Sequence, residues 1–170
     1  MKLTIINGSP CSGKSTIIKR VLKEKEHFFY LSYDSLKWQF SNYVSGKYKE
    51  DILEMLLVMA ERAFDLQYDV VSDVGLTRVW REKLKDIAVA HKYEIVEINL
   101  EADFDVCATR FDERVLSALT KPESRIANTS KEKFKEMYDL YQTNKNPNAI
   151  TLRTDVASVE EVRSRVLELL

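Results

Sequence analysis

Residues 8–16 read Gly8-Ser9-Pro10-Cys11-Ser12-Gly13-Lys14-Ser15-Thr16, which matches the pattern G-x-x-x-x-G-K-S of the phosphate-binding P-loop. A short β-branched stretch, Lys2 to Asn7, precedes it, and a helical pattern begins at Ile17. The order strand, glycine loop, helix directs backbone N–H groups and the positive end of a helix dipole at phosphate. The sequence therefore predicts that the whole stretch binds a nucleoside triphosphate.

Several side chains of this loop have distinct predicted roles. Lys14 is expected to reach the β- and γ-phosphates, the hydroxyl of Ser15 to ligate Mg²⁺, and Thr16 to hydrogen-bond the α-phosphate. The two glycines allow the tight turn, because they carry no Cβ atom. Cys11 lies near the helix N-terminus, where a thiolate is stabilised, so it is either a reactive thiol that nucleotide protects or a small buried residue.

Composition and charge limit the functional classes. The chain has 170 residues, 45% hydrophobic and 31% charged, so we expect one domain over residues 1–170. The net charge of −1 at pH 7 argues against strong non-specific binding to nucleic acid or to a membrane surface. Two cysteines, Cys11 and Cys107, are too few for a disulfide framework. Since we also find neither a signal peptide nor an apolar run of membrane-spanning length, we expect a cytoplasmic protein.

Strand and helix patterns alternate along the rest of the chain. Strands are expected at residues 2–7, 28–33, 69–74, 93–100 and 149–154. Apolar residues recur at helical spacing in residues 47–67, where Met55 and Met59 are interpreted as core filling. Capping-box patterns at Thr129 and Ser158 predict two later helix starts. This alternation predicts an α/β fold, a doubly wound five-stranded parallel sheet with helices on both faces.

Acidic residues follow two of the predicted strands. Ligands of an open parallel sheet bind beyond the carboxyl ends of its strands, which places Asp34 and Asp73 near the P-loop. Asp34 either caps a helix that starts at Ser35 or acts on a bound ligand. Asp73 is either the acidic residue that P-loop proteins place near Mg²⁺ or a turn carboxylate. Three aromatic residues after Asp34 either wall a second pocket or belong to the core: Trp38, Phe40 and Tyr43.

A pair of arginines follows the fourth predicted strand. Arg110 and Arg114 are four residues apart on a predicted helix and therefore lie on one face. The pair suits a phosphate clamp, because a guanidinium binds phosphate oxygens through two parallel hydrogen bonds. Pairing with Asp112, Glu113 or a remote acid is the alternative. The weakly patterned segment around residues 110–130 is expected to form a lid over the nucleotide.

Together these elements resemble the small P-loop kinases of the adenylate-kinase-like group, and most closely the polynucleotide kinase and zeta-toxin-like set of ATP-binding domains. The resemblance covers nearly the whole chain. It is carried by the P-loop, by Asp34-x-x-Lys37, by Val70-Val71-Ser72-Asp73 and by Arg110-x-x-x-Arg114. Polynucleotide kinases have an arginine where this chain has Lys37, and a lysine cannot clamp a phosphate bidentately.

The resemblance implies transfer of the γ-phosphoryl group of ATP, with Mg²⁺, to a hydroxyl acceptor. The segment from Asn144 to Pro147 lacks the final aspartate of the guanine-reading motif N-K-x-D, so GTP is rejected. The implied catalytic residues are Lys14, Asp34, Arg110 and Arg114, with Asp34 as the base. Ser15 and Asp73 would serve the metal, and the acceptor would meet Lys37, Trp38 and Asp73. A nucleic-acid 5′-hydroxyl, a nucleoside, a sugar and an antibiotic remain open as acceptors, and the alternative function is an ATP-dependent regulatory switch.

Overall fold

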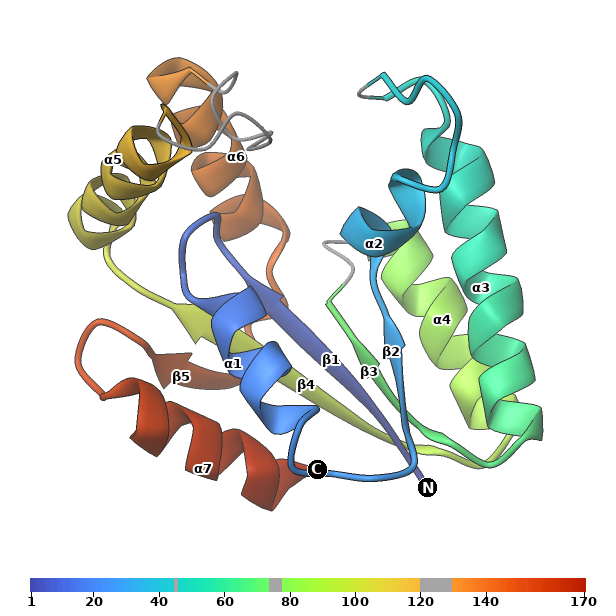
Figure 1. The fold of residues 1–170 in the computed structure, drawn as a ribbon. Helices are drawn as coiled ribbons and strands as arrows, with labels where there is room; N and C mark the ends of the chain where they lie inside the picture. The colour runs from blue at the N-terminus through green and yellow to red at the C-terminus, as the bar shows by residue number, and fades with distance from the viewer. Residues whose placement is uncertain (45, 74–77, 120–129) are drawn as a thin grey trace.

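The computed structural model describes residues 1–44, 46–73, 78–119 and 130–170 (Figure 1). Its strands are β1 (Lys2–Gly8), β2 (Phe28–Leu31), β3 (Asp69–Ser72), β4 (Glu94–Glu101) and β5 (Ile150–Arg153). All four neighbouring pairs are parallel, in the order β2-β3-β1-β4-β5. The predicted doubly wound five-stranded parallel sheet is confirmed.

The helices cover both faces of this sheet. They are α1 (Lys14–Val21), α2 (Tyr33–Lys37), α3 (Lys49–Asp65), α4 (Arg78–Ala90), α5 (Phe104–Leu119), α6 (Lys131–Asn144) and α7 (Val159–Leu169). Successive strand residues point to opposite faces: Val70 packs in the cluster under α3 and α4, whereas Val71 packs in the cluster under α1 and α7. Strands buried on both faces explain the nearly continuous apolar runs in the sequence. In the described part of the chain, no helix is both long and apolar enough to cross a membrane.

Helices α5 and α6 form an arm with a small core of its own. This core contains Phe111 of α5 and Phe134 of α6, whose rings stack with their centroids 4.6 Å apart. The hydroxyl of Tyr138 donates to the carbonyl of Ala102 at 3.1 Å, which ties α6 to the end of β4. Figure 1 shows the arm on one side of the sheet's upper edge and α2 on the other. The arm therefore holds the face of α5 at a defined place beside the P-loop.

The strand order explains why the functional elements converge. The P-loop follows β1, α2 follows β2 and α5 follows β4, so all three begin at the carboxyl edge of the same sheet. From the central β1, the chain runs to β2 and β3 on one side and to β4 and β5 on the other. Such a reversal of strand order opens a crevice at the carboxyl edge, where ligands of doubly wound sheets bind.

Three local expectations need correction. Helix α3 covers Lys49–Asp65 rather than residues 47–67, and Met55 and Met59 are 51% and 37% exposed rather than core filling. Only one side of α3 packs against the sheet and α4, so the other side of its broad apolar stripe faces solvent. Helix α6 is capped by Ser130, one residue later than predicted, while Thr129 lies outside the described residues. The capping box of Ser158 is confirmed.

Candidate active site

The P-loop has the backbone geometry of an anion site. A Cβ atom on Gly8 would lie 2.5 Å from the Ser12 hydroxyl oxygen and 2.8 Å from the Leu100 carbonyl oxygen, so only glycine fits there. Gly13 has a φ of 89°, in the left-handed region, and caps α1 without a side-chain hydrogen bond. The first turn of α1 carries no acidic residue, so its N–H groups and dipole are available to a phosphate. The side chain of Lys14 is partly exposed, and those of Ser15 and Thr16 are exposed.

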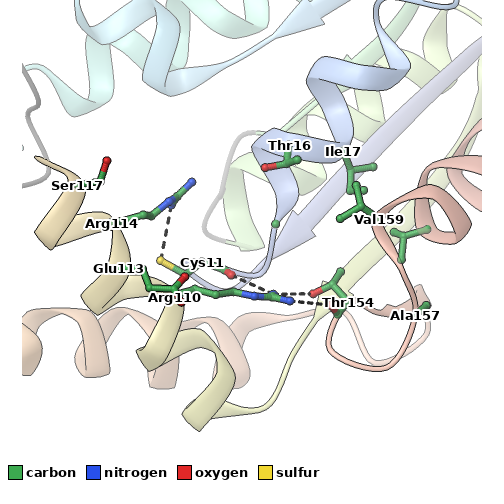
Figure 2. A pocket seen from close by; sticks show the side chains of 12 residues that line it. Cys11, Thr16, Ile17, Arg110, Glu113, Arg114, Ser117, Thr154, Ala157 and Val159 are labelled. Carbon is green, nitrogen blue, oxygen red and sulfur yellow. Dashed lines mark hydrogen bonds between the residues drawn. The ribbon is translucent and has the colours of Figure 1, made fainter. Parts of the chain in front are cut away.

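A cavity of about 330 Å³ lies beside the P-loop (Figure 2). Three parts of the chain line it: the P-loop with α1, one face of α5, and the connection from β5 to α7 together with the start of α7. Its described lining residues are Cys11, Gly13, Thr16, Ile17, Arg110, Glu113, Arg114, Ser117, Thr154, Ala157, Val159 and Val162. The cavity thus joins one end of a phosphate loop to a partly apolar chamber, which suits a nucleotide.

The two predicted arginines both line this cavity, but they make different contacts. Nη2 of Arg110 donates to the Thr154 carbonyl at 2.7 Å, and Nη1 donates to the Thr154 hydroxyl at 3.2 Å and to the Cys11 carbonyl at 3.4 Å. Nη1 of Arg114 lies 3.6 Å from the sulfur of Cys11. Figure 2 shows the two guanidinium groups pointing to different parts of the cavity. Arg110 is thus held by backbone and hydroxyl oxygens, whereas Arg114 reaches toward the P-loop itself.

The alternative that these arginines pair with nearby acids finds no support among the described residues. Asp112 pairs with Lys131 at 2.7 Å. Within the described ranges, neither Arg110 nor Arg114 forms an ion pair. Of the predicted lid, Arg110 to Leu119 belong to α5, and residues 120–129 lie outside the described residues.

Asp34 is not the cap of α2. The cap is Ser32, whose hydroxyl accepts a 3.3 Å hydrogen bond from the amide of Ser35. Ser32 has the extended backbone of an N-cap residue, while Asp34 is already inside the helix. The side chain of Asp34 is 78% exposed and forms an ion pair with Lys37 one turn later. An exposed carboxylate with no capping duty therefore stands on α2, beyond the carboxyl end of β2.

Aromatic rings surround the ammonium group of Lys37. Its Nζ lies 4.9 Å from the ring centre of Trp38, 5.9 Å from that of Tyr43 and 6.0 Å from that of Tyr33. Trp38 is 42% exposed, so it can meet a ligand. Phe40 and Tyr43 instead pack against the core under α3, as one of the two alternatives expected, and a pocket role of Trp38 stays a prediction.

Asp73 follows β3 directly and accepts a hydrogen bond from a neighbouring strand. The hydroxyl of Tyr30, on β2, donates to Oδ2 of Asp73 at 2.5 Å. Burial raises the pKa of Tyr30, and the hydrogen bond to Asp73 raises it further, so the phenol stays protonated and remains a donor. Asp73 is thus an oriented carboxylate at the carboxyl edge of the sheet.

Most of the chain matches a known protein family. The family model described as an AAA domain spans residues 3–141. The chain belongs to this family. A search of curated proteins finds no significant match.

The fold of this AAA domain is shared with solved P-loop proteins. A kinase candidate from Chloroflexus aurantiacus has a TM-score of 0.74 at 14% identity, over 99% of this chain and 94% of the other. APS kinase CysC of Mycobacterium tuberculosis, with AMPPNP and APS, has a TM-score of 0.65 at 17% identity, over 99% and 96%. Kti12 of Chaetomium thermophilum, with ADP-AlF3, has a TM-score of 0.64 at 16% identity, over 98% and 97%. The resemblance to small P-loop kinases is confirmed, and this fold implies that the AAA domain binds a nucleotide.

The donor set of the AAA domain fits Mg²⁺ that is held together with a nucleotide. Mg²⁺ keeps several waters and takes one or two protein oxygens plus phosphate oxygens. The exposed hydroxyl of Ser15 at the start of α1 and the carboxylate of Asp73 are oxygen ligands of this kind. Among the described residues, no group of three or more His, Cys, Asp or Glu side chains could hold a metal by itself. The hydroxyl of Ser15 and the carboxylate of Asp73 are thus oxygens of the kind that Mg²⁺ takes beside phosphate.

Among the residues of the site that sequence reasoning missed are two that make hydrogen bonds there. Thr154 lines the cavity and contacts Arg110, and Tyr30 orients Asp73. Both lie at or near the carboxyl ends of strands, where doubly wound sheets bind ligands. That position is the signal that could have identified them, although neither residue belongs to a recognisable motif.

Proposed function

We propose that this AAA domain transfers the γ-phosphoryl group of ATP to a hydroxyl acceptor. The observation that carries the proposal is the exposed carboxylate of Asp34, which has no capping role and stands at the same sheet edge as the P-loop and the arginine-lined cavity. A protein that only binds and hydrolyses ATP has no need of a separate carboxylate on the acceptor side.

In this proposal, residues 8–16 would bind the triphosphate and the adjoining cavity would bind the nucleoside. The N–H groups of the loop and of the first turn of α1 would donate to the phosphate oxygens, and Lys14 would reach the β- and γ-phosphates. Ala157 and Val159 supply apolar surface to the cavity, which suits the flat face of a base. Arg110, on α5, also lines the cavity, and its guanidinium is held by Thr154.

In the proposed reaction, the protein aligns the reacting groups and neutralises the charge of the phosphates. Phosphoryl transfer depends mainly on alignment and on neutralising charge on the phosphate oxygens. Lys14 and Arg114 would supply positive charge to the phosphate oxygens. Arg110 would add a further positive charge from the cavity wall. Ser15 and Asp73 would hold Mg²⁺, which neutralises the β- and γ-phosphate oxygens when it is bound.

Asp34 would act as the base. It would orient the acceptor hydroxyl and take its proton while the oxygen of that hydroxyl bonds to the γ-phosphorus and the bond from that phosphorus to the β,γ-bridging oxygen breaks, so ADP leaves. The ion pair with Lys37 keeps the carboxylate oriented in the absence of an acceptor. Lys37 and Trp38 would contact the acceptor itself.

The experiment is a transfer screen with γ-labelled ATP and Mg²⁺. It includes an oligonucleotide with a free 5′-hydroxyl, nucleosides, sugars, and aminoglycoside and phenicol antibiotics. Label that appears on one of these acceptors supports the proposal and identifies the acceptor class. ATP binding without transfer to any of them contradicts the kinase and favours the regulatory switch.

The two cysteines, Cys11 and Cys107, are both free thiols, which suits the proposed reducing, cytoplasmic setting.

A further inference from the structure

Thr154 is the point at which three separate segments of the site meet. It follows directly after β5, and its backbone amide donates to the Glu101 carbonyl at the end of β4 at 2.7 Å. Its hydroxyl donates to the Ser12 carbonyl of the P-loop at 2.8 Å and lies 3.3 Å from the Glu101 carbonyl. Its hydroxyl and carbonyl oxygens both accept from Arg110. One residue therefore contacts the loop, the end of β4 and the arm helix α5.

The contacts of Thr154 determine how Arg110 faces the cavity. Nη1 and Nη2 of Arg110 are engaged by Thr154, and Nη1 also reaches the Cys11 carbonyl. Two neighbouring nitrogens of a planar guanidinium held by fixed oxygens leave it one orientation. Without the Thr154 hydroxyl, Nη1 would keep only its 3.4 Å contact to Cys11. Arg110 would then be held mainly by its Nη2 bond to the Thr154 carbonyl, which allows the guanidinium plane more rotational freedom.

The same hydroxyl holds the P-loop in place. The Ser12 carbonyl precedes Gly13, the residue whose left-handed conformation starts α1. The donor from Thr154 fixes the peptide between Ser12 and Gly13, and so it fixes the direction of the next amides toward the phosphates. Loss of the donor would leave a loop carbonyl without this partner, next to the phosphate site.

We propose that Thr154 is a positioning residue for ATP, acting through Arg110 and through the Ser12 carbonyl. The inference rests on the proposed function only in that ATP occupies the P-loop and the adjoining cavity. It does not depend on which acceptor receives the phosphoryl group, or on whether one does.

The test is a double-mutant cycle read as the dissociation constant of Mg-ATP, measured by calorimetry. Thr154→Val keeps the shape of the side chain but removes the hydroxyl, and we expect it to weaken ATP binding roughly tenfold. Thr154→Ser restores the hydroxyl and should bind within about threefold of wild type. In an Arg110→Ala background, Thr154→Val should cost clearly less ATP affinity than in the wild type, because one of the two partners of the hydroxyl is already absent.

Control measurements separate positioning from general damage. Thr151→Val makes the same chemical change at an exposed site on the preceding strand β5, and its ATP affinity should equal that of wild type. Thermal unfolding shows whether each variant is folded at the assay temperature. If Thr154→Val does not fold, Thr154→Ala takes its place in the cycle.

The outcomes distinguish the inference from the proposed function. Equal losses from Thr154→Val in both backgrounds overturn the route through Arg110 and leave the Ser12 carbonyl as the route. Wild-type affinity of Thr154→Val, or failure of Thr154→Ser to restore binding, overturns the whole inference and leaves the proposed function standing. Absence of phosphoryl transfer with a preserved cycle overturns the kinase alone. A wild-type protein that binds no ATP overturns both.

Discussion

The hydroxyl of Tyr30 donates a 2.5 Å hydrogen bond to Oδ2 of Asp73, which joins the carboxyl ends of β2 and β3. The parallel register sets Tyr30 beside Val71, two residues before Asp73, so the long phenol reaches the strand end. The bond engages Oδ2 and orients the Asp73 carboxylate, which would serve Mg²⁺ in the proposed reaction.

The first prediction follows from this contact. Tyr30→Phe leaves Asp73 in place but unoriented, so we expect the Mg²⁺ concentration for half-maximal turnover to rise roughly tenfold. A Mg²⁺ titration of the rate at saturating ATP measures it. Tyr93→Phe is the matched control, because it removes phenol hydrogen bonds to the Phe64 and Tyr68 carbonyls away from the P-loop. An unchanged Mg²⁺ requirement in Tyr30→Phe would show that Asp73 does not serve the metal.

The second prediction concerns Lys14. Its partly exposed side chain contributes little packing, so Lys14→Ala should fold normally. Removal of its charge should lower turnover by a factor on the order of 10² to 10³, since the charge matters only against phosphate. Rate assays with circular dichroism as a fold check provide the measurement, and Lys19→Ala, an exposed lysine on the same helix, is the control. A folded Lys14→Ala enzyme with the wild-type rate would contradict the assignment.

The third prediction concerns Arg114, the arginine that reaches toward the P-loop. Among the described residues Arg114 has no carbonyl partner where it approaches the P-loop, so Arg114→Ala should lower turnover on the order of 10²-fold with a smaller effect on ATP affinity. Arg114→Lys should not restore the rate, because a lysine lacks the fork of donors. Steady-state kinetics and ATP binding provide the comparison, with Arg165→Lys on the exposed face of α7 as control. If only the Michaelis constant for ATP rises, Arg114 binds the ground state and is not a catalytic residue.

The fourth prediction concerns the two thiols. Cys11 is partly exposed inside the P-loop, whereas Cys107 is fully buried and burial raises its pKa. Maleimide should therefore label Cys11 first, block ATP binding, and react more slowly when Mg-ATP is present. Mass spectrometry locates the label, and Cys11→Ser is the control that should lose the fast reaction. Equal labelling rates with and without Mg-ATP would favour a thiol that merely fills space.

The fifth prediction tests the base. Because Ser32 caps α2, Asp34→Asn removes only a first-turn charge and its ion pair, and we expect a stability loss below about 1 kcal/mol. Asparagine cannot accept the proton, so transfer to the acceptor should fall by a factor on the order of 10² to 10⁴ with ATP affinity nearly unchanged. Lys37→Met shows how much of the effect comes from the ion pair. If Asp34→Asn transfers the phosphoryl group at the wild-type rate, Asp34 is not the base.

Local patterns were sufficient for most of the elements. The P-loop, the alternation of strands and helices and the capping box of Ser158 each depend on residues close together in the sequence, so their periodicity and spacing predicted them. Predictions failed where burial depends on a distant partner. The apolar stripe of α3 is wider than the surface available to cover it, which leaves Met55 and Met59 exposed.

The sequence by itself determined that this chain builds a phosphate loop on a parallel sheet, because the motif G-x-x-x-x-G-K-S and its flanking strand and helix lie within one short stretch. Only the tertiary structure decided which side chains meet around that loop. Thr154 and Ser12 are 142 residues apart, and Tyr30 and Asp73 are 43 apart. Their contacts exist because the strand order brings the ends of β2 and β3 together and sets the end of β5 beside β4, and no local pattern encodes that order.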